Sequence, residues 1–97
     1  MIGMLEGAPV VLCDQCELRI ASATEGNYYW SPGEDSVSNV FFNHKRCEVA
    51  FEREHSPGAD TIWLSGELID FPIFLGDNLA LKWGDARKHA STQARRA

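Results

Sequence analysis

Two short pairs of cysteine and histidine residues constrain this chain more than any other feature of its sequence. The first is a C-x-x-C pair, and the second, 27 residues further on, is an H-x-x-C pair. Together they offer three thiolates and one imidazole, which is a complete tetrahedral ligand set for Zn²⁺. We therefore expect one structural zinc ion, held by Cys13, Cys16, His44 and Cys47.

Length and composition favour one small domain around this site. The chain has 97 residues, 44% of them hydrophobic, which is typical of a globular protein rather than a disordered one. Chains this short bury a limited core, so a metal that closes a long loop adds stability. We expect a single domain over residues 1–90, with the zinc module at about 8–55, a helical part at about 60–90 and a flexible tail at 91–97.

Cysteine usage and the N-terminal residues indicate a compartment. All three cysteines fall within the two pairs, so none remains for a disulfide framework, and a reducing compartment is favoured. Residues 1–12 carry no basic side chain and their apolar residues are interrupted by Gly, Glu and Pro, unlike a signal peptide. No stretch approaches the ~18 to 20 apolar residues of a membrane span. We expect a cytoplasmic protein with no membrane contact.

A knuckle, a hairpin and a helix are predicted in that order. Residues 8–12 form an apolar strand that leads into the first pair, and 17–23 alternate like a half-buried strand. Residues 28–30 and 37–42, which are aromatic and β-branched, flank a loop rich in Ser, Pro and Gly and predict a β-hairpin. Asn43 is the expected N-cap of a helix over 44–55. One face of this helix would carry His44, Cys47 and Phe51.

The last third of the chain is predicted to be mainly helical. A helical turn is expected at 65–69. Pro72 permits a helix that starts after Asp70, but Asp77 is the preferred N-cap. This helix should fray near His89. Its apolar face would comprise Leu79, Trp83 and Ala86.

The order of these elements resembles the treble-clef zinc finger. The resemblance covers about residues 8–55 and rests on the four ligands already named. The ligand pattern is also similar to the first zinc module of LIM domains, although the gap here is longer and no second ligand set follows. It is similar as well to small uncharacterised bacterial and phage zinc-binding proteins. The resemblance implies a small zinc-stabilised α+β domain, with a zinc knuckle, a β-hairpin and a helix, followed here by a C-terminal helix.

A filled ligand set argues against catalysis. Catalytic zinc keeps an open coordination position, and four protein ligands leave none, so we expect a protein that is not an enzyme. A deaminase-like site would need H-x-E, whereas Arg46 stands two residues after His44. A nuclease of the HNH type would need a free histidine as its base, and His55 and His89 stand without partnering motifs. Another metal-dependent hydrolase would depend on Glu48 or His55. A redox role for the first pair would require it at a helix N-terminus within a βαβ unit.

Charge is distributed unevenly and bears on the choice of partner. Residues 1–70 carry twelve acidic and four basic side chains, whereas 71–97 carry two acidic and five basic ones. An acidic body repels phosphate, so we expect a protein-interaction or regulatory module rather than a nucleic-acid coat. The alternative is a nucleic-acid-binding zinc finger. Its basic residues would be Lys45, Arg46, Arg53, Arg87 and Lys88, with Arg95 and Arg96 of the tail.

Two apolar regions are candidates for contact surfaces. A domain this small is expected to cover only one face of its hairpin, so one or two of Tyr29, Trp30 and Phe41 should stay exposed. Residues 71–81 either seal the core or form the seam of a homodimer.

Overall fold

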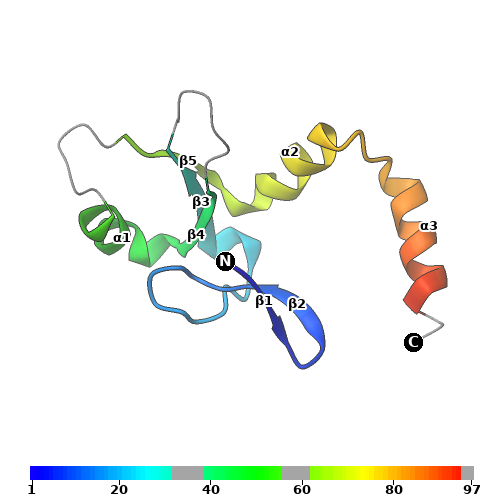
Figure 1. The fold of residues 1–97 in the computed structure, drawn as a ribbon, viewed down its shortest axis with the longest axis horizontal. Coiled ribbons are helices and arrows are strands. Elements are labelled where there is room, and N and C mark those ends of the chain that lie inside the picture. Colours follow the sequence, from blue (N-terminus) through cyan, green and yellow to red (C-terminus); the bar gives the residue numbers. More distant parts are fainter. Residues whose placement is uncertain (32–38, 56–61, 95–97) are drawn as a thin grey trace.

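Three antiparallel strands in the order β4-β3-β5 form the central sheet (Figure 1). The computed structural model describes residues 1–31, 39–55 and 62–94. The central strand β3 (Gly26–Trp30) pairs with β4 (Phe41–His44) on one side and with β5 (Leu64–Glu67) on the other. The predicted hairpin is confirmed by the pairing of β3 with β4. Of the residues predicted for its second strand, 37 and 38 lie outside the described residues, and 39 and 40 are not in a strand.

A separate two-stranded sheet precedes the first ligand pair. Strands β1 (Ile2–Leu5) and β2 (Ala8–Val11) pair antiparallel. Their turn residues Glu6 and Gly7 have φ values of 51° and 81°, the left-handed conformation that closes two-residue hairpins. The strand predicted at 8–12 is confirmed for residues 8–11. Strand β1 was not predicted, because glycine has a low strand preference and Gly3 interrupts the segment.

The prediction of a strand at residues 17–23 is wrong. Only one isolated bridge, between Leu12 and Arg19, forms in this segment. The φ of Glu17 is 66°, which turns the chain out of the extended conformation. The Ser22 side chain then accepts a hydrogen bond from the backbone of the short 3₁₀ helix η1 (Ala23–Glu25) and caps it. Residues 17–23 alternate between polar and apolar side chains, but they form a turn, an isolated bridge and the start of a helical turn instead of one strand.

The helix predicted at 44–55 begins later than expected. Strand β4 extends to His44, where it pairs with Gly26, so Asn43 lies within the strand and is not an N-cap. A 3₁₀ turn, η2 (Lys45–Cys47), follows the strand, and helix α1 (Glu48–Glu54) follows the turn. Pairing with β3 satisfies the backbone of residues 43 and 44 and delays the helix. The predicted end is confirmed, since the N–H of the C-cap residue His55 donates to the Phe51 carbonyl at 2.9 Å.

The C-terminal part contains two helices where one was preferred. Strand β5 occupies most of the predicted helical turn, so only η3 (Leu68–Asp70) is helical there. Helix α2 (Phe71–Asn78) has Asp70 as its N-cap and Pro72 in its first turn, so the preference for Asp77 was wrong. Helix α3 (Trp83–Ala94) continues well past residue 89, and only 95–97 of the predicted tail lie outside the described residues.

A Schellman motif separates α2 from α3. The N–H of Leu81 donates to the Gly76 carbonyl at 2.8 Å, and the N–H of Ala80 donates to the Asp77 carbonyl at 3.1 Å. Ala80 adopts φ 53°, a position that usually carries glycine. An alanine gave no sequence signal for this break, which explains why a continuous helix past Leu79 was predicted instead.

Both faces of the central sheet are covered. On one face the ring of Tyr28 packs against Phe71 of α2, with centroids 4.9 Å apart. On the other face Tyr29 packs against Phe51 of α1, with centroids 5.3 Å apart, and is fully buried. The expectation that one or two of Tyr29, Trp30 and Phe41 stay exposed is therefore wrong, because Tyr29 is buried and Trp30 and Phe41 are half-buried. Short flanking helices are enough to cover a three-stranded sheet on both sides.

The packing of a tyrosine ring across the neighbouring strand explains why residue 66 is a glycine. Gly66 of β5 lies opposite Tyr28, and a Cβ at this position would lie 2.6 Å from the tyrosine ring. The ring can lie across the neighbouring strand only because residue 66 has no side chain. The same ring stacks on Trp30 with centroids 5.3 Å apart, which orients it toward α2.

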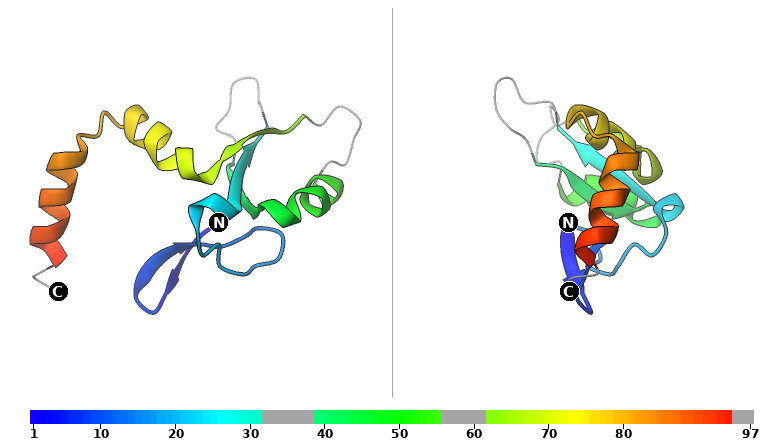
Figure 2. Two further views of the ribbon diagram at one scale, coloured as in Figure 1. Left: turned by 180° about the vertical axis from the view of Figure 1, so that it is seen from behind. Right: turned by 90° about the vertical axis from the view of Figure 1, so that its right-hand side faces the viewer.

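The two C-terminal helices extend the molecule in one direction. Helix α2 leaves the sheet, and α3 stands apart from the sheet and from α1 in Figure 1 and in the left view of Figure 2. The principal extents are 50 × 31 × 21 Å and the radius of gyration is 15.6 Å. A chain of this length packed as a sphere-like domain would have about 13 Å. The excess reflects the projecting helices.

Candidate metal centre

The first ligand pair lies in a tight loop that leaves β2. The Cys13 N–H donates to the Leu18 carbonyl and the Glu17 N–H donates to the Cys13 carbonyl, both at 2.9 Å. Together with the left-handed backbone of Glu17, these bonds fold residues 13–17 into a closed knuckle. The Cys16 N–H then lies 3.4 Å from the Cys13 sulfur. The Cys13 and Cys16 sulfurs themselves lie within 4.8 Å of each other, so they are on the same side of the loop.

The second pair lies where β4 passes into η2. His44 is the last residue of the strand, and Cys47 is the last residue of the 3₁₀ turn. Residues three apart are eclipsed in a 3₁₀ turn, which favours a common direction for both side chains. The strand thus positions the imidazole and the turn positions the thiol.

All four predicted ligands come together. Their ligand atoms lie within 4.8 Å of one another, so they could hold one metal ion. Cys13 and His44 are buried, whereas Cys16 and Cys47 are half-buried. Each cysteine is free of disulfide bonds. The Cys16 sulfur lies 3.3 Å from His44 Nδ1, which bridges the two pairs directly.

The backbone around Cys13 favours its thiolate. Burial opposes ionisation, but hydrogen bonds from the backbone of Cys16, His44 and Gln15 outweigh it and lower the pKa of Cys13 from 9.0 to about 6. One of these donors is the His44 N–H, which lies 3.4 Å from the sulfur. The knuckle thus stabilises one negative charge before any cation is added.

The opposite holds for Cys47. Burial, together with hydrogen bonding and repulsion from the sulfurs of Cys13 and Cys16, raises the pKa of Cys47 from 9.0 to about 11. Three thiolates in one small site therefore repel one another. A divalent cation at their centre would offset most of this repulsion and allow all three thiols to be deprotonated. The electrostatics of the cluster fit a bound metal ion.

The imidazole of His44 is oriented by Arg19. Its Nε2 lies 3.1 Å from the Arg19 carbonyl oxygen, which can only accept a hydrogen bond. Nε2 therefore carries the proton in the neutral ring and leaves the lone pair of Nδ1 directed at the cluster. A carbonyl that fixes the tautomer of a ligating histidine is a regular feature of protein metal sites. The sequence does not indicate this contact, because a backbone carbonyl is not specific to any residue type.

Asn43 is a second residue that the sequence did not reveal as part of the site. Its side chain is fully buried, with Oδ1 lying 3.6 Å from the Cys13 sulfur, and its Nδ2 has no hydrogen-bond partner among the described residues. A thiol at Cys13 can donate to Oδ1, but a thiolate only accepts. Rotation of the nearly symmetric amide by 180° would direct Nδ2–H at the thiolate. The orphaned amide group therefore fits a deprotonated Cys13.

The other candidate residues are dispersed. His55 stacks on Phe51 with ring centroids 4.3 Å apart, and its Nδ1 lies 3.0 Å from the Phe51 carbonyl, so the ring is part of the aromatic packing. The candidate basic residues that the structure describes fall into two groups, while Arg95 and Arg96 lie outside the described residues. Lys45, Arg46 and Arg53 lie on η2 and α1, whereas Arg87 and Lys88 lie on α3 at the far end of the molecule (Figure 1).

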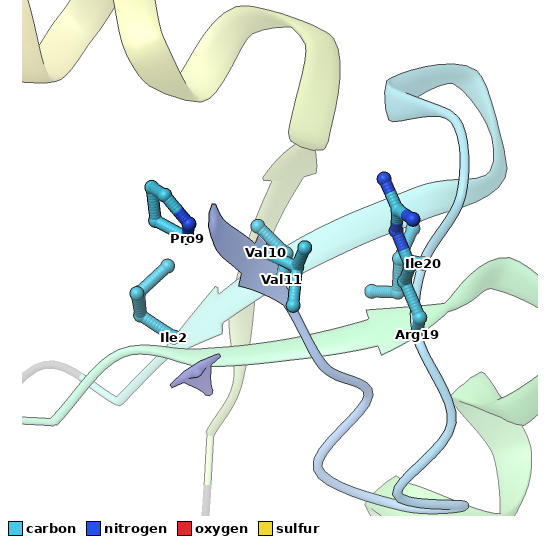
Figure 3. Close-up of a pocket in the computed structure, with 6 residues that line it drawn as sticks. All are labelled: Ile2, Pro9, Val10, Val11, Arg19 and Ile20. Atoms are coloured by element: carbon cyan, nitrogen blue, oxygen red, sulfur yellow. The ribbon is translucent and has the colours of Figure 1, made fainter. Parts of the chain in front are cut away.

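A recess near the metal centre carries no catalytic set. It has a volume of about 340 Å³ and is lined by the N-terminal hairpin and the segment that follows the knuckle (Figure 3). Its lining residues are Ile2, Pro9, Val10, Val11, Arg19 and Ile20. Five of the six are apolar, and none is a carboxylate, thiol or imidazole. The recess therefore supplies no nucleophile or general base.

Comparisons of the chain with protein-family models, with curated proteins and with solved structures found no match. Among the described residues, no helix has both the length and the apolar character needed to cross a membrane. The metal centre and the surfaces around it are therefore the basis for assigning a function.

Proposed function

We propose that the chain is a non-enzymatic zinc-binding module that acts as a protein-interaction or regulatory factor. The observation that carries this proposal is the cluster of three sulfurs and one imidazole nitrogen within 4.8 Å. Bonds of ~2.3 Å to sulfur and ~2.0 Å to nitrogen in a tetrahedron put neighbouring ligands roughly 3.5 to 3.8 Å apart. The observed cluster needs only a small contraction to reach this geometry.

The ligand types support zinc over other divalent ions. Thiolates are soft ligands and exclude Mg²⁺ and Ca²⁺, which prefer oxygen. A four-coordinate set of three cysteines and one histidine is a regular structural zinc site. Three free thiols in such a site also suit a reducing compartment, and we place the protein in the cytoplasm.

A structural role is supported by the surroundings of the cluster. All four tetrahedral positions are supplied by side chains, which leaves none for water or substrate. His55, the one other imidazole near the sheet, is engaged in the aromatic packing around Phe51. The metal would therefore join the knuckle to the end of β4 and stabilise the fold.

The proposed partner is a protein because of the exposed apolar surface at the C-terminal end. Ile73, Phe74 and Leu75 of α2 are exposed by 54%, 54% and 47%. Small soluble proteins seldom leave so many large apolar side chains in one region unless another molecule covers them. The apolar side chains of α2 are close together and suit contact with a protein. The basic residues are dispersed and suit contact with a phosphate backbone less well.

Nucleic-acid binding is the second candidate, and one observation favours it. Lys45 and Arg46 line a recess of about 350 Å³ next to His44, which could receive a phosphate. Lys45 is however engaged with Glu67 at 2.7 Å, and Arg87 lies on the distant α3. A gel shift at low salt that disappears steeply as salt rises would support this candidate over the first.

The metal assignment is tested by native mass spectrometry of the purified protein, followed by chelation. We expect one Zn²⁺ per chain and a lower melting temperature after chelation, since metal-binding energy is folding energy in such sites. Protein purified with no bound metal, or with a melting curve that chelation leaves unchanged, would refute the proposal.

A further inference from the structure

We define the C-terminal arm as residues 69–94. Many of its large apolar side chains are not covered by any other part of the chain. Seven of its large apolar side chains are between 37% and 68% exposed. They are Ile69, Ile73, Phe74, Leu75, Leu79, Leu81 and Trp83. Three of them, Ile73, Phe74 and Leu75, are consecutive residues of α2 and so point to different sides of the helix, which is apolar nearly all round. Helices of this kind are buried in their functional state.

The arm is anchored at one end and internally ordered. Phe71 at the start of α2 packs edge-on against Phe42 of the sheet, with centroids 5.1 Å apart. Near its middle, where α3 begins, the indole of Trp83 lies over Gly76 of α2, and an added Cβ there would be 2.7 Å from the ring. The arm therefore has a defined shape without a covering layer.

Helix α3 receives little stabilisation from packing against the rest of its own chain. It has twelve residues and stands apart from the sheet (Figure 2, left). Isolated helices of ~12 to 15 residues are marginal in water. A surface that packs against the arm would stabilise α3.

A recess for an apolar side chain lies beside α2. It measures about 300 Å³ and is lined by Tyr28, Trp30, Val40, Phe71, Phe74, Leu75 and Asn78. The polar side-chain groups of its lining residues are the Asn78 amide, the Tyr28 hydroxyl and the Trp30 indole N–H, and no lining residue is charged, so the recess is poorly equipped to orient a polar small ligand. An apolar side chain from another protein chain fits this chemistry better.

Two properties of the chain identify the occupant as a second copy. The first is charge: Lys82, Arg87 and Lys88 make no ion pair with any described residue, while residues 1–70 carry twelve acidic side chains against four basic ones. The second is area. At roughly 100 Å² per half-exposed side chain, the arm offers on the order of 700 Å² per copy, close to the ~800 Å² that each partner buries in a stable complex.

We propose that the arm is a dimerisation element. Two copies pack α2 against α2 about a two-fold axis, with an apolar side chain of each arm in the recess of the other. The basic α3 of one copy then lies over the acidic body of its partner. This inference rests on the proposed function as a protein-interaction module and names its partner.

Sedimentation equilibrium of the full metal-loaded chain, at low to high micromolar concentrations, tests the proposal. We expect a mass of twice 10.8 kDa. Ile73→Glu should raise the dimer dissociation constant about 30-fold or more, as for a residue central to an interface. Val49→Glu on α1 is the matched control, because Val49 is also β-branched, helical and exposed, at 67%. It should change the constant less than about 2-fold.

A second variant tests the placement of α3. Arg87→Glu should weaken dimerisation several-fold at low salt and much less at high salt, since it reverses a charge over an acidic surface. A chain that binds one metal ion but remains monomeric at every concentration would overturn the dimer and leave the zinc module standing. A dimer unaffected by Ile73→Glu would equally overturn the assignment to the arm. Metal content measured on each variant separates these results from loss of the fold.

Discussion

Asp14 and Phe42 hold each other by two hydrogen bonds of 2.7 Å. The Phe42 N–H donates to the Asp14 carboxylate, and the Asp14 N–H donates to the Phe42 carbonyl. Asp14 stands inside the first ligand pair, and Phe42 lies two residues before the second. The knuckle is therefore fastened to β4 by the protein itself, which brings the two ligand pairs together. A metal ion adds to an arrangement that is already organised.

Replacing a ligand should remove the metal and destabilise the fold. We expect Cys13→Ser to lower metal affinity by more than ~100-fold, because mutation of residues that only hydrogen-bond to metal ligands already lowers it by ~10 to 100-fold. The melting temperature should fall by about 10 °C or more. Metal titration and circular dichroism measure both effects. Gln15→Ala, within the same loop but outside the ligand set, should retain its metal; equal losses in both variants would contradict the assignment.

Asn43 should tune the metal site without being a ligand. Asn43→Asp removes the two amide protons and adds a negative charge beside Cys13, whose sulfur lies 3.6 Å from the side chain. We expect metal affinity to fall by about 10 to 100-fold. The absorption of the Co²⁺-substituted protein should shift as well, since the thiolate loses its donor. Asn78→Asp, the same change on α2, is the control, and an identical spectrum in the Asn43 variant would remove the donor role.

The aromatic core beneath α1 should be sensitive to truncation. Phe51 is fully buried between Tyr29, Phe41 and Trp63, so Phe51→Ala should lower the free energy of unfolding by about 3 to 5 kcal/mol. Phe74→Ala should cost less than about 1 kcal/mol in the monomer, because that ring is 54% exposed. Urea denaturation compares the two, and similar midpoints would contradict the described packing.

Glycine at position 80 should stabilise the protein. Ala80 adopts φ 53° in the Schellman motif, and a left-handed conformation costs an alanine about 1 kcal/mol that glycine avoids. Ala80→Gly should therefore raise the free energy of unfolding by a few tenths to about 1 kcal/mol. Ala90→Gly, inside α3, should lower it by about 0.5 to 1 kcal/mol. Thermal melts in which both variants move the same way would disprove the proposed turn.

The ion pair between Lys45 and Glu67 should titrate at low pH. A hydrogen bond and attraction from Lys45, 2.7 Å away, lower the pKa of Glu67 below 4.5. A lowered carboxyl pKa stabilises the fold above the unfolded value and ceases to do so as pH falls through the folded value. Lys45→Ala should return the pKa toward 4.5, as followed by NMR titration. Stability at neutral pH should hardly change, because the pair is exposed.

The sequence predicted the composition of the site better than the path of the chain. The clustering of Cys13, Cys16, His44 and Cys47, the hairpin and the α+β class followed from spacing and from strand preference. The helix start did not, because cross-strand pairing of β4 overrode the capping preference of Asn43. Strand β5 was missed because Ser65 and Gly66 have low strand preference, and Gly66 is there to admit the Tyr28 ring. Such long-range contacts leave no local pattern.

Phe42 also has a consequence for the relation between the two ends of the molecule. Its backbone is bound to the metal knuckle, and its ring packs edge-on against Phe71, the first residue of the arm's α2. One residue is thus common to both structures. If metal loading shifts Phe42 and thereby changes how strongly the arm associates, association must change metal affinity by the same factor. The fraction of dimer and the amount of bound metal would then report on the same coupled equilibrium.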